Sequence, residues 1–236
     1  MKLKSLIYAS ALVLTIGVAG CQNSGKKSEV NLTSKNDSVS YALGVLIGGS
    51  NKEQMKEAPG ADQLNKEILI AAWEKAFRGD SVLIKPDKAN ATIQKFFAEV
   101  SKVEGDKNLK AGEEFLAANK TKPGVVTLPS GLQYEIIKAG TGPKPKADDQ
   151  VKCNYEGTTI DGTVFDSSIK RGQPATFPVN RVIPGWTEAL QLMPVGSKWK
   201  LYIPAALAYG ERGAGKDIKP NSTLIFEVEL LDIEKK

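Results

Sequence analysis

The sequence of 236 residues contains no histidine and only two cysteines, Cys21 and Cys153. The absence of histidine excludes Ser-His-Asp and Cys-His catalysis as well as any zinc site that uses a histidine ligand. Two isolated cysteines provide neither a CxxC pair nor a disulfide framework. We therefore predict no metal site and no cofactor, and any chemistry must use groups other than histidine.

The sequence also lacks a strong excess of charge of either sign. Its formal net charge is +5, and two of its lysines, Lys2 and Lys4, lie in a segment that we expect to be removed. It contains no arginine-rich tract and no basic stripe interleaved with aromatic residues. These features exclude nucleic acid as a predicted partner.

One long apolar run is present, from Leu6 to Ala19, and it is too short to cross the ~30 Å of hydrocarbon, which needs about 20 residues. Two lysines precede it and Val18-Ala19-Gly20-Cys21 follows, which is the layout of an export signal. The final four residues resemble a bacterial lipobox, whose cysteine carries the lipid. We expect residues 1–20 to be a lipoprotein signal peptide and Cys21 to be lipidated. The alternative is an ordinary cleaved signal in which Cys21 is incidental.

Residues 21–36 are polar and rich in serine, asparagine and lysine, so they are predicted to form a flexible tether between the membrane and a folded domain. Cys153 alternates with polar residues in a predicted strand. We expect it to be a small buried apolar residue.

Helical periodicity dominates residues 37–118. A first helix is predicted to start at Asp37 or Ser38 and to end at Gly48-Gly49. A second spans about 61–78, with a broad apolar face, and Gly79 suits its end. A third starts near Pro86 and extends to about residue 118, with a bend or break favoured at Gly105 or Gly112. Residues 119–131, with two prolines and two glycines, are predicted to be a connector.

Short alternating strands and turn residues dominate residues 132–236. The strand candidates are 132–138, 150–158, 163–166, 175–179, 197–203 and 222–231. Asp161-Gly162 predicts a hairpin whose two central positions have positive φ. One short helix, Trp186 to Leu192, interrupts the strands. The pattern predicts an α+β fold in which an antiparallel sheet wraps over this helix, after an all-α N-terminal module.

Six aromatic residues are spaced through this last region, within the blocks DGTVFDSS (161–168), NRVIPGWTEALQLMPVG (180–196), LAYG (207–210) and NSTLIFEVELLDI (221–233). The aromatics are Tyr155, Phe165, Phe177, Trp186, Tyr209 and Phe226. Their order, with turn glycines such as Gly157 and Gly185, resembles the FK506-binding family of peptidyl-prolyl isomerases. From about Asp37 onward the chain resembles the Mip-like (macrophage infectivity potentiator-like) bacterial branch of that family.

The resemblance implies a half-barrel domain that isomerises X-Pro bonds of unfolded or folding exported polypeptides. It also implies a homodimer formed through residues 37–118, whereas composition alone favours a monomeric helical core containing Trp73, Phe77, Phe96 and Phe97. The lipobox-like end of the signal predicts a lipid anchor in the bacterial cell envelope, and Gln22 in place of a retaining aspartate favours the outer membrane, facing the periplasm. The rival interpretation is a holdase chaperone that binds Pro-containing segments with little or no catalysis.

The resemblance also assigns roles to individual residues. Trp186 would form the pocket floor, Tyr209 would donate its hydroxyl to a substrate carbonyl, and the Asp166 carboxylate would face the amide, with Arg171 near it. Phe226 completes the catalytic set. The implied substrate-binding residues are Tyr155, Phe165, Phe177, Val182, Ile183 and Ile218, and Phe177 is divided about evenly between pocket and core.

Two positions depart from the best-known eukaryotic members, which carry a histidine where this chain has Ala214 and a pocket phenylalanine where it has Ala175. Both departures resemble the Mip-like branch. They leave open how tightly the implied macrolide ligand would bind.

Overall fold

The computed structural model describes residues 30–56 and 58–234. The predicted signal peptide, Cys21 and most of the predicted tether lie outside these described residues. The chain forms two compact units, of which the first ends at Gly49 and the second spans Ser50–Lys236. Within the described ranges, no helix is both long and apolar enough to cross a membrane.

The first helix, α1, spans Lys35–Lys56 and continues through Gly48-Gly49, so the predicted end was wrong. A glycine ends a helix where it adopts the left-handed conformation, and neither of these glycines has positive φ. The start was also misplaced, because Ser34 is the capping residue. The amide of Asp37 donates to Ser34 Oγ (3.1 Å), and the amide of Ser34 donates to Asp37 Oδ2 (2.8 Å), in a reciprocal capping box.

The second predicted helix is divided into a short 3₁₀ turn, η1 (Ala61–Gln63), and α2 (Lys66–Arg78). The Asn65 side chain causes this division, because it accepts hydrogen bonds from the amides of Glu67 and Ile68 and so caps α2. Gly79 ends α2 with φ of 77°, as predicted.

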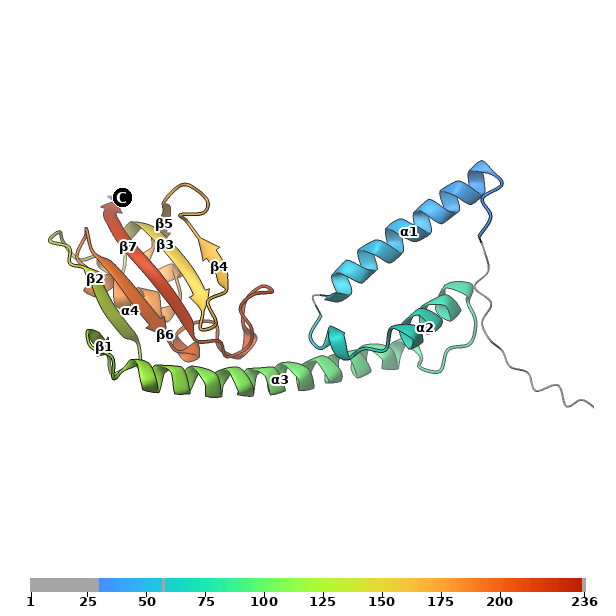
Figure 1. The fold of residues 1–236 in the computed structure, drawn as a ribbon, viewed down its shortest axis with the longest axis horizontal. Helices are drawn as coiled ribbons and strands as arrows, with labels where there is room; N and C mark the ends of the chain where they lie inside the picture. The colour runs from blue at the N-terminus through green and yellow to red at the C-terminus, as the bar shows by residue number, and fades with distance from the viewer. Residues whose placement is uncertain (1–29, 57, 235–236) are drawn as a thin grey trace, which may run out of the picture. The chain divides into compact units, whose positions relative to one another are not determined.

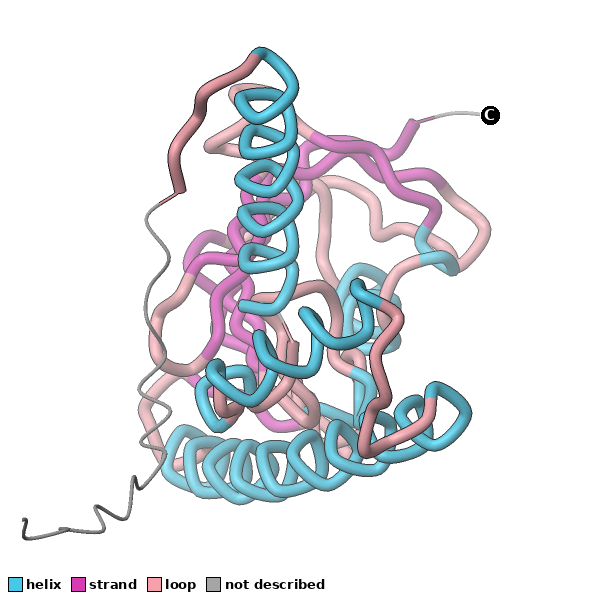
Figure 2. The backbone as a smooth tube through the Cα atoms, turned by 90° about the vertical axis from the view of Figure 1, so that its right-hand side faces the viewer, coloured by secondary structure: helices cyan, strands magenta, loops and turns pink. Residues whose placement is uncertain are grey.

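The third helix, α3, spans Pro86–Asn119 without a break (Figure 2). The expected bend at Gly105 or Gly112 was wrong, because both glycines face the sheet domain and let it approach. A side chain at Gly105 would meet Pro220 and Asn221, and one at Gly112 would overlap Thr223. Apart from Phe115, the stripe that faces the domain is polar or small, and it continues to the buried Asn119.

Seven antiparallel strands follow (Figure 1). They are β1 (Val125–Thr127), β2 (Gln133–Lys138), β3 (Gln150–Thr159), β4 (Val164–Ser167), β5 (Ala175–Pro178), β6 (Lys198–Ile203) and β7 (Leu224–Glu234). Their order is β1-β2-β6-β7-β3-β4, and β5 pairs with β3. Six were predicted within a few residues, whereas β1 lies in the predicted connector and was missed.

The hairpin between β3 and β4 forms as predicted, but its turn differs. Gly162 alone of the two central residues has positive φ, at 88°. The turn is closed by hydrogen bonds from Thr159 N to Thr163 O and from Gly162 N to Thr159 O, both 3.0 Å. Asp161 keeps negative φ because its carboxylate accepts from Thr159 and from the amide of Thr163, which builds a longer loop.

Helix α4 spans Pro184–Leu192 and lies against the sheet (Figure 1). Trp186, Ala189 and Leu190 of α4 join one buried cluster with side chains of β3, β6 and β7. This is the α+β fold predicted from the sequence, an antiparallel sheet over one short helix after a helical N-terminal region.

Candidate active site

A hollow of about 600 Å³ opens in the sheet domain. All ten residues that the resemblance assigned to the site line it: Tyr155, Phe165, Asp166, Phe177, Val182, Ile183, Trp186, Tyr209, Ile218 and Phe226. They come from β3, β4, β5, β7, from the start of α4 and from the loops before α4 and β7. The hollow has the size of a typical small-ligand pocket.

Trp186 lies at the centre of the aromatic lining and is only 4% exposed. Its ring meets those of Tyr155 (5.3 Å between centroids, 90°), Phe177 (5.6 Å, 77°) and Phe226 (5.2 Å, 82°). These edge-to-face arrangements are the favoured geometry of aromatic pairs. Phe177, which the sequence left between core and pocket, contacts both. Three rings therefore fix the orientation of the indole.

Local sequence explains how these rings meet. Strand alternation puts Tyr155 of β3 and Phe226 of β7 on the same buried face. Gly157 pairs with Phe226 across the two strands. It is a strand residue and not the predicted turn glycine, and it matters because a side chain there would lie 2.6 Å from the Phe165 ring and 2.7 Å from Phe226. Gly185 likewise lies in α4 rather than in a turn, against Ile203.

Asp166 is held at the pocket edge by two side chains. The hydroxyl of Tyr155 donates to Asp166 Oδ2 (2.5 Å), and the Arg171 guanidinium pairs with the other carboxylate oxygen. Arg171 Nη2 also donates to the Tyr155 hydroxyl oxygen (2.8 Å), which closes a triangle of three polar groups. The carboxylate therefore has a fixed direction.

This triangle sets the charge at the rim. Burial raises the pKa of Asp166, but the hydrogen bonds from Tyr155 and Arg171 outweigh it, so the pKa lies below the ordinary 3.8. Burial and the bond to Asp166 raise the pKa of Tyr155 above 10.0. At neutral pH the site contains an ionised carboxylate beside a protonated phenol.

Tyr209 also lines the hollow and is 41% exposed. Burial, and then the charge of Asp166, raise its pKa above 10.0, so its hydroxyl keeps its proton. Ile183 precedes Pro184 at the N-cap of α4, where an amide N–H lies outside the helical hydrogen-bond ladder. Two donors are thus available at the pocket.

The sequence prediction missed three charged lining residues, Arg181, Lys216 and Asp217. Arg181 lies inside one of the quoted blocks, but a loop sequence does not indicate which side chains turn toward a hollow. Ala214 lines the pocket, and Ala175 packs against the core beside it.

Cys153 is fully buried and burial raises the pKa of its thiol to about 12, which agrees with the predicted small apolar role.

The geometry suits chemistry without proton transfer. Within residues 30–56 and 58–234, no cluster of three or more acidic or cysteine side chains could hold a metal ion. Most of the lining side chains are apolar, and the charged ones are those of Asp166, Arg181, Lys216 and Asp217. Such a site removes water from a bound group and offers fixed donors and one fixed carboxylate to it.

Residues 142–231 match the family described as FKBP-type peptidyl-prolyl cis-trans isomerase, and residues 36–136 match the domain amino terminal to that isomerase. The outer membrane protein MIP of Legionella longbeachae is 43% identical over 243 residues, covering 100% of this chain and 99% of that protein. The isomerase FkpA of Aeromonas hydrophila is 48% identical over 204 residues, covering 83% and 75%.

The crystal structure of FkpA from Escherichia coli superimposes with a TM-score of 0.64 at 38% identity, covering 86% of this chain and 99% of that one. Identity at this level extends through both the helical region and the sheet domain. The chain therefore belongs to the FKBP-type peptidyl-prolyl cis-trans isomerases, with Mip and FkpA proteins among its relatives.

Proposed function

We propose that the aromatic hollow of the sheet domain is the catalytic site and that it isomerises X-Pro bonds in exported polypeptides. The barrier to rotation is about 18–20 kcal/mol, because amide resonance keeps the C–N bond planar. Water stabilises the polar planar amide more than the twisted form. A dry pocket therefore lowers the barrier without a covalent intermediate.

Each lining residue has a role in this proposal. The prolyl ring rests on Trp186, with Phe226 and Phe165 as walls. Tyr209 donates its hydroxyl to a substrate carbonyl, and the Ile183 amide supplies a second donor. Asp166 faces the twisting bond, and Tyr155 and Arg171 position it.

The observation that carries the proposal is the fixed aromatic floor beside an ionised, immobilised carboxylate. Trp186 is contacted edge-on by three rings, and Asp166 is held by two hydrogen-bonding partners. A surface that only binds proline segments needs apolar walls but no carboxylate directed at the amide. The geometry thus favours turnover over simple binding.

Refolding of a denatured protein whose slow phase is X-Pro isomerisation tests this proposal. We expect the chain to shorten that phase and Phe226→Ala to lose roughly tenfold or more of the acceleration, with Ile169→Ala, an exposed residue outside the pocket, as the matched control. An unchanged slow phase together with less aggregation would favour the holdase alternative.

The helical region is proposed to form a homodimer through residues 37–118. No residue of α2 is buried, and Ile70, Trp73 and Phe77, which share one helical face, are 56%, 47% and 77% exposed. A contiguous exposed apolar face of this kind marks a protein interface in soluble chains. Trp73 and Phe77 therefore do not fill a core within the described chain, which supports the dimer over the monomeric alternative.

The remaining assignments complete the proposal. The chain is divided into a signal peptide (1–20), tether (21–36), helical dimerisation domain (37–118), connector (119–131) and isomerase domain (132–236).

Lipid on Cys21 anchors the chain to the outer membrane, facing the periplasm. The MIP relative is named as an outer membrane protein, which supports the envelope location. Recovery of a Cys21→Ser variant in the membrane fraction, as for the parent, would contradict the anchor.

The same hollow is proposed to accept a macrolide ligand, because such a ligand would occupy the prolyl site. Ala214 on the rim provides no aromatic or imidazole contact, so the affinity depends on the aromatic floor. Competition between a macrolide and a proline peptide, followed by Trp186 fluorescence in a variant lacking Trp73 and Trp199, tests this assignment.

A further inference from the structure

Helix α3 contacts the loop that forms one rim of the catalytic hollow. We call residues 210–221 the rim loop. Gly105 brings the helix backbone against the end of this loop and Gly112 brings it against the residues just after, since a side chain at Gly105 would lie 3.2 Å from Pro220 Cβ and one at Gly112 would overlap Thr223 Oγ1. Asn108 lies between these glycines, three and four residues away, on the same helical face. The helix and the end of the rim loop are therefore in direct contact.

Asn108 makes a specific bond within this contact. Its Nδ2 donates to the carbonyl oxygen of Pro220 at 2.9 Å, and the bond is partly buried. The next residue, Asn221, has φ of 55°, in the left-handed region, and its amide donates to Gly210 O at 2.8 Å. That second bond closes the base of the rim loop. The Asn108 bond therefore holds the base of the rim loop, one residue before Asn221.

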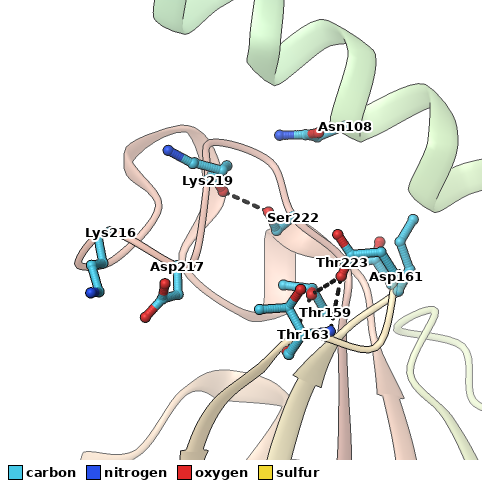
Figure 3. Close-up of a pocket in the computed structure, with 10 residues that line it drawn as sticks. Asn108, Thr159, Asp161, Thr163, Lys216, Asp217, Lys219, Ser222 and Thr223 are labelled. Atoms are coloured by element: carbon cyan, nitrogen blue, oxygen red, sulfur yellow. Dashed lines mark hydrogen bonds between the residues drawn. The ribbon is translucent and has the colours of Figure 1, made fainter. Parts of the chain in front are cut away.

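A polar hollow of about 270 Å³ lies between α3 and the rim loop (Figure 3). Some of its polar groups are bonded to one another: the Asp161 carboxylate accepts from Thr159 and from the Thr163 amide, and Ser222 Oγ donates to Lys219 O at 2.8 Å. Groups already engaged in this way have little left to offer a ligand. We therefore interpret this hollow as part of the contact between α3 and the rim loop rather than as a second binding site.

The opposite side of the rim loop faces the catalytic hollow. Ile218, only 7% exposed, and Ala214 line that hollow, and paired backbone hydrogen bonds of 2.8 and 3.2 Å hold them to each other. Lys216 and Asp217 line both hollows. The rim loop is therefore fixed at its base by α3, while its tip forms a wall for the substrate.

We propose that Asn108 is a positioning residue for the isomerase. By holding Pro220 it keeps the rim loop in the shape that places Ile218 against a bound prolyl segment. The inference rests on the proposed prolyl site. A loop that is already ordered costs less free energy to fix on binding, so loss of the bond should raise KM more than it changes kcat.

The test compares two substitutions on one helix in the full chain. Asn108→Asp keeps the shape of the side chain but replaces its donor with a carboxylate that repels the Pro220 carbonyl. Asn90→Asp makes the same change at an exposed position of α3 away from the rim loop. We expect a rise in KM of about threefold for a Leu-Pro peptide in Asn108→Asp, kcat within about twofold, and no change in Asn90→Asp.

Hydrogen exchange of the amides at 213–219 provides a second readout, and it should quicken only in Asn108→Asp. Asn108→Ala, which removes the bond without adding charge, repeats the comparison if the aspartate variant does not fold. An active parent whose KM is unchanged by the Asn108 substitution would overturn the inference. A parent without any isomerase activity would instead overturn the proposed prolyl site.

Discussion

At the scale of single residues, the site depends on the missing side chain of Gly157 as much as on its aromatic rings. Gly157 lies in the middle of β3, where glycine is normally unfavourable, and its missing side chain is what lets Phe165 and Phe226 meet at 5.4 Å. The aromatic pattern was visible in the sequence, and the ten assigned residues do gather around one hollow. The sequence did not show why position 157 is a glycine, because its neighbours Phe165 and Phe226 are distant along the chain and come close only through strand pairing.

Gly157→Ala should reduce kcat/KM by roughly tenfold or more, because small displacements of positioned groups are costly in catalysis. Overpacking should also reduce the free energy of unfolding by about 1–3 kcal/mol. Peptide exchange kinetics and urea denaturation measure the two effects. Gly162→Ala is the control: nothing lies within 4 Å of its added carbon, but its φ is 88°. It should lose stability and keep its kcat/KM, and equal activity losses in both variants would refute the packing argument.

The charge state of the rim predicts the pH dependence. Asp166 has a lowered pKa, so its ionised bonds to Tyr155 and Arg171 are fully present above pH 3.8 and are lost as pH falls through the lower folded value. Tyr155 and Tyr209 have pKa values above 10.0. With no histidine in the chain, kcat/KM should be flat from pH 5 to about 9. Peptide exchange followed by NMR measures this directly, and any inflection near pH 6–7 in the parent would contradict it.

At the scale of elements, α3 shows where sequence periodicity fails. The face that packs on the sheet domain contains Gly105, Asn108, Gly112, Phe115 and Asn119, which recur at helical spacing but are mostly not apolar. The helical pattern of apolar residues therefore does not reveal this face, and its glycines were predicted to be breaks. Strand β1 was missed for a related reason: its three residues, which begin directly after Gly124, carry little pattern, and only pairing with β2 makes them a strand.

The same helix ends in a buried hydrogen-bond network that should contribute to stability. Asn119 Nδ2 donates to Gln133 Oε1 (3.0 Å), and Gln133 Nε2 donates to Leu116 O (2.9 Å). Gln133→Ala leaves buried groups unpaired and should cost about 1–3 kcal/mol of unfolding free energy. Urea denaturation at one fixed protein concentration measures this cost. Gln150→Ala, on an exposed strand end, is the control, and similar midpoints for both variants would show that the network contributes nothing.

At the scale of the whole molecule, the proposed dimer would carry two catalytic sites. Two linked sites raise the local concentration of binding surface for one unfolded chain. This explains how a small prolyl pocket could serve large clients. The helical region would then set the geometry in which a client is bound, and the sheet domain would rotate its X-Pro bonds.

Placing charge on the exposed face of α2 should break this assembly. A Trp73→Asp and Phe77→Asp double variant is expected to be monomeric in light scattering coupled to gel filtration, because burying two carboxylates in an apolar interface is unfavourable. Ile169→Asp, an exposed apolar position of the sheet domain that is 60% accessible, should leave the parent assembly intact. A parent that is itself monomeric would contradict the dimer.

The most direct test of the central claim is the cis/trans exchange rate of a Leu-Pro or Phe-Pro peptide, measured by NMR with the parent chain and with Asp166→Ala, Tyr209→Phe and Phe226→Ala. We predict strong acceleration by the parent and a loss of roughly tenfold or more in Phe226→Ala, equivalent to about 1.4 kcal/mol of transition-state stabilisation, with the fold intact. Folded variants that all exchange the peptide as fast as the parent, or a parent that only binds it, would contradict catalysis by this pocket.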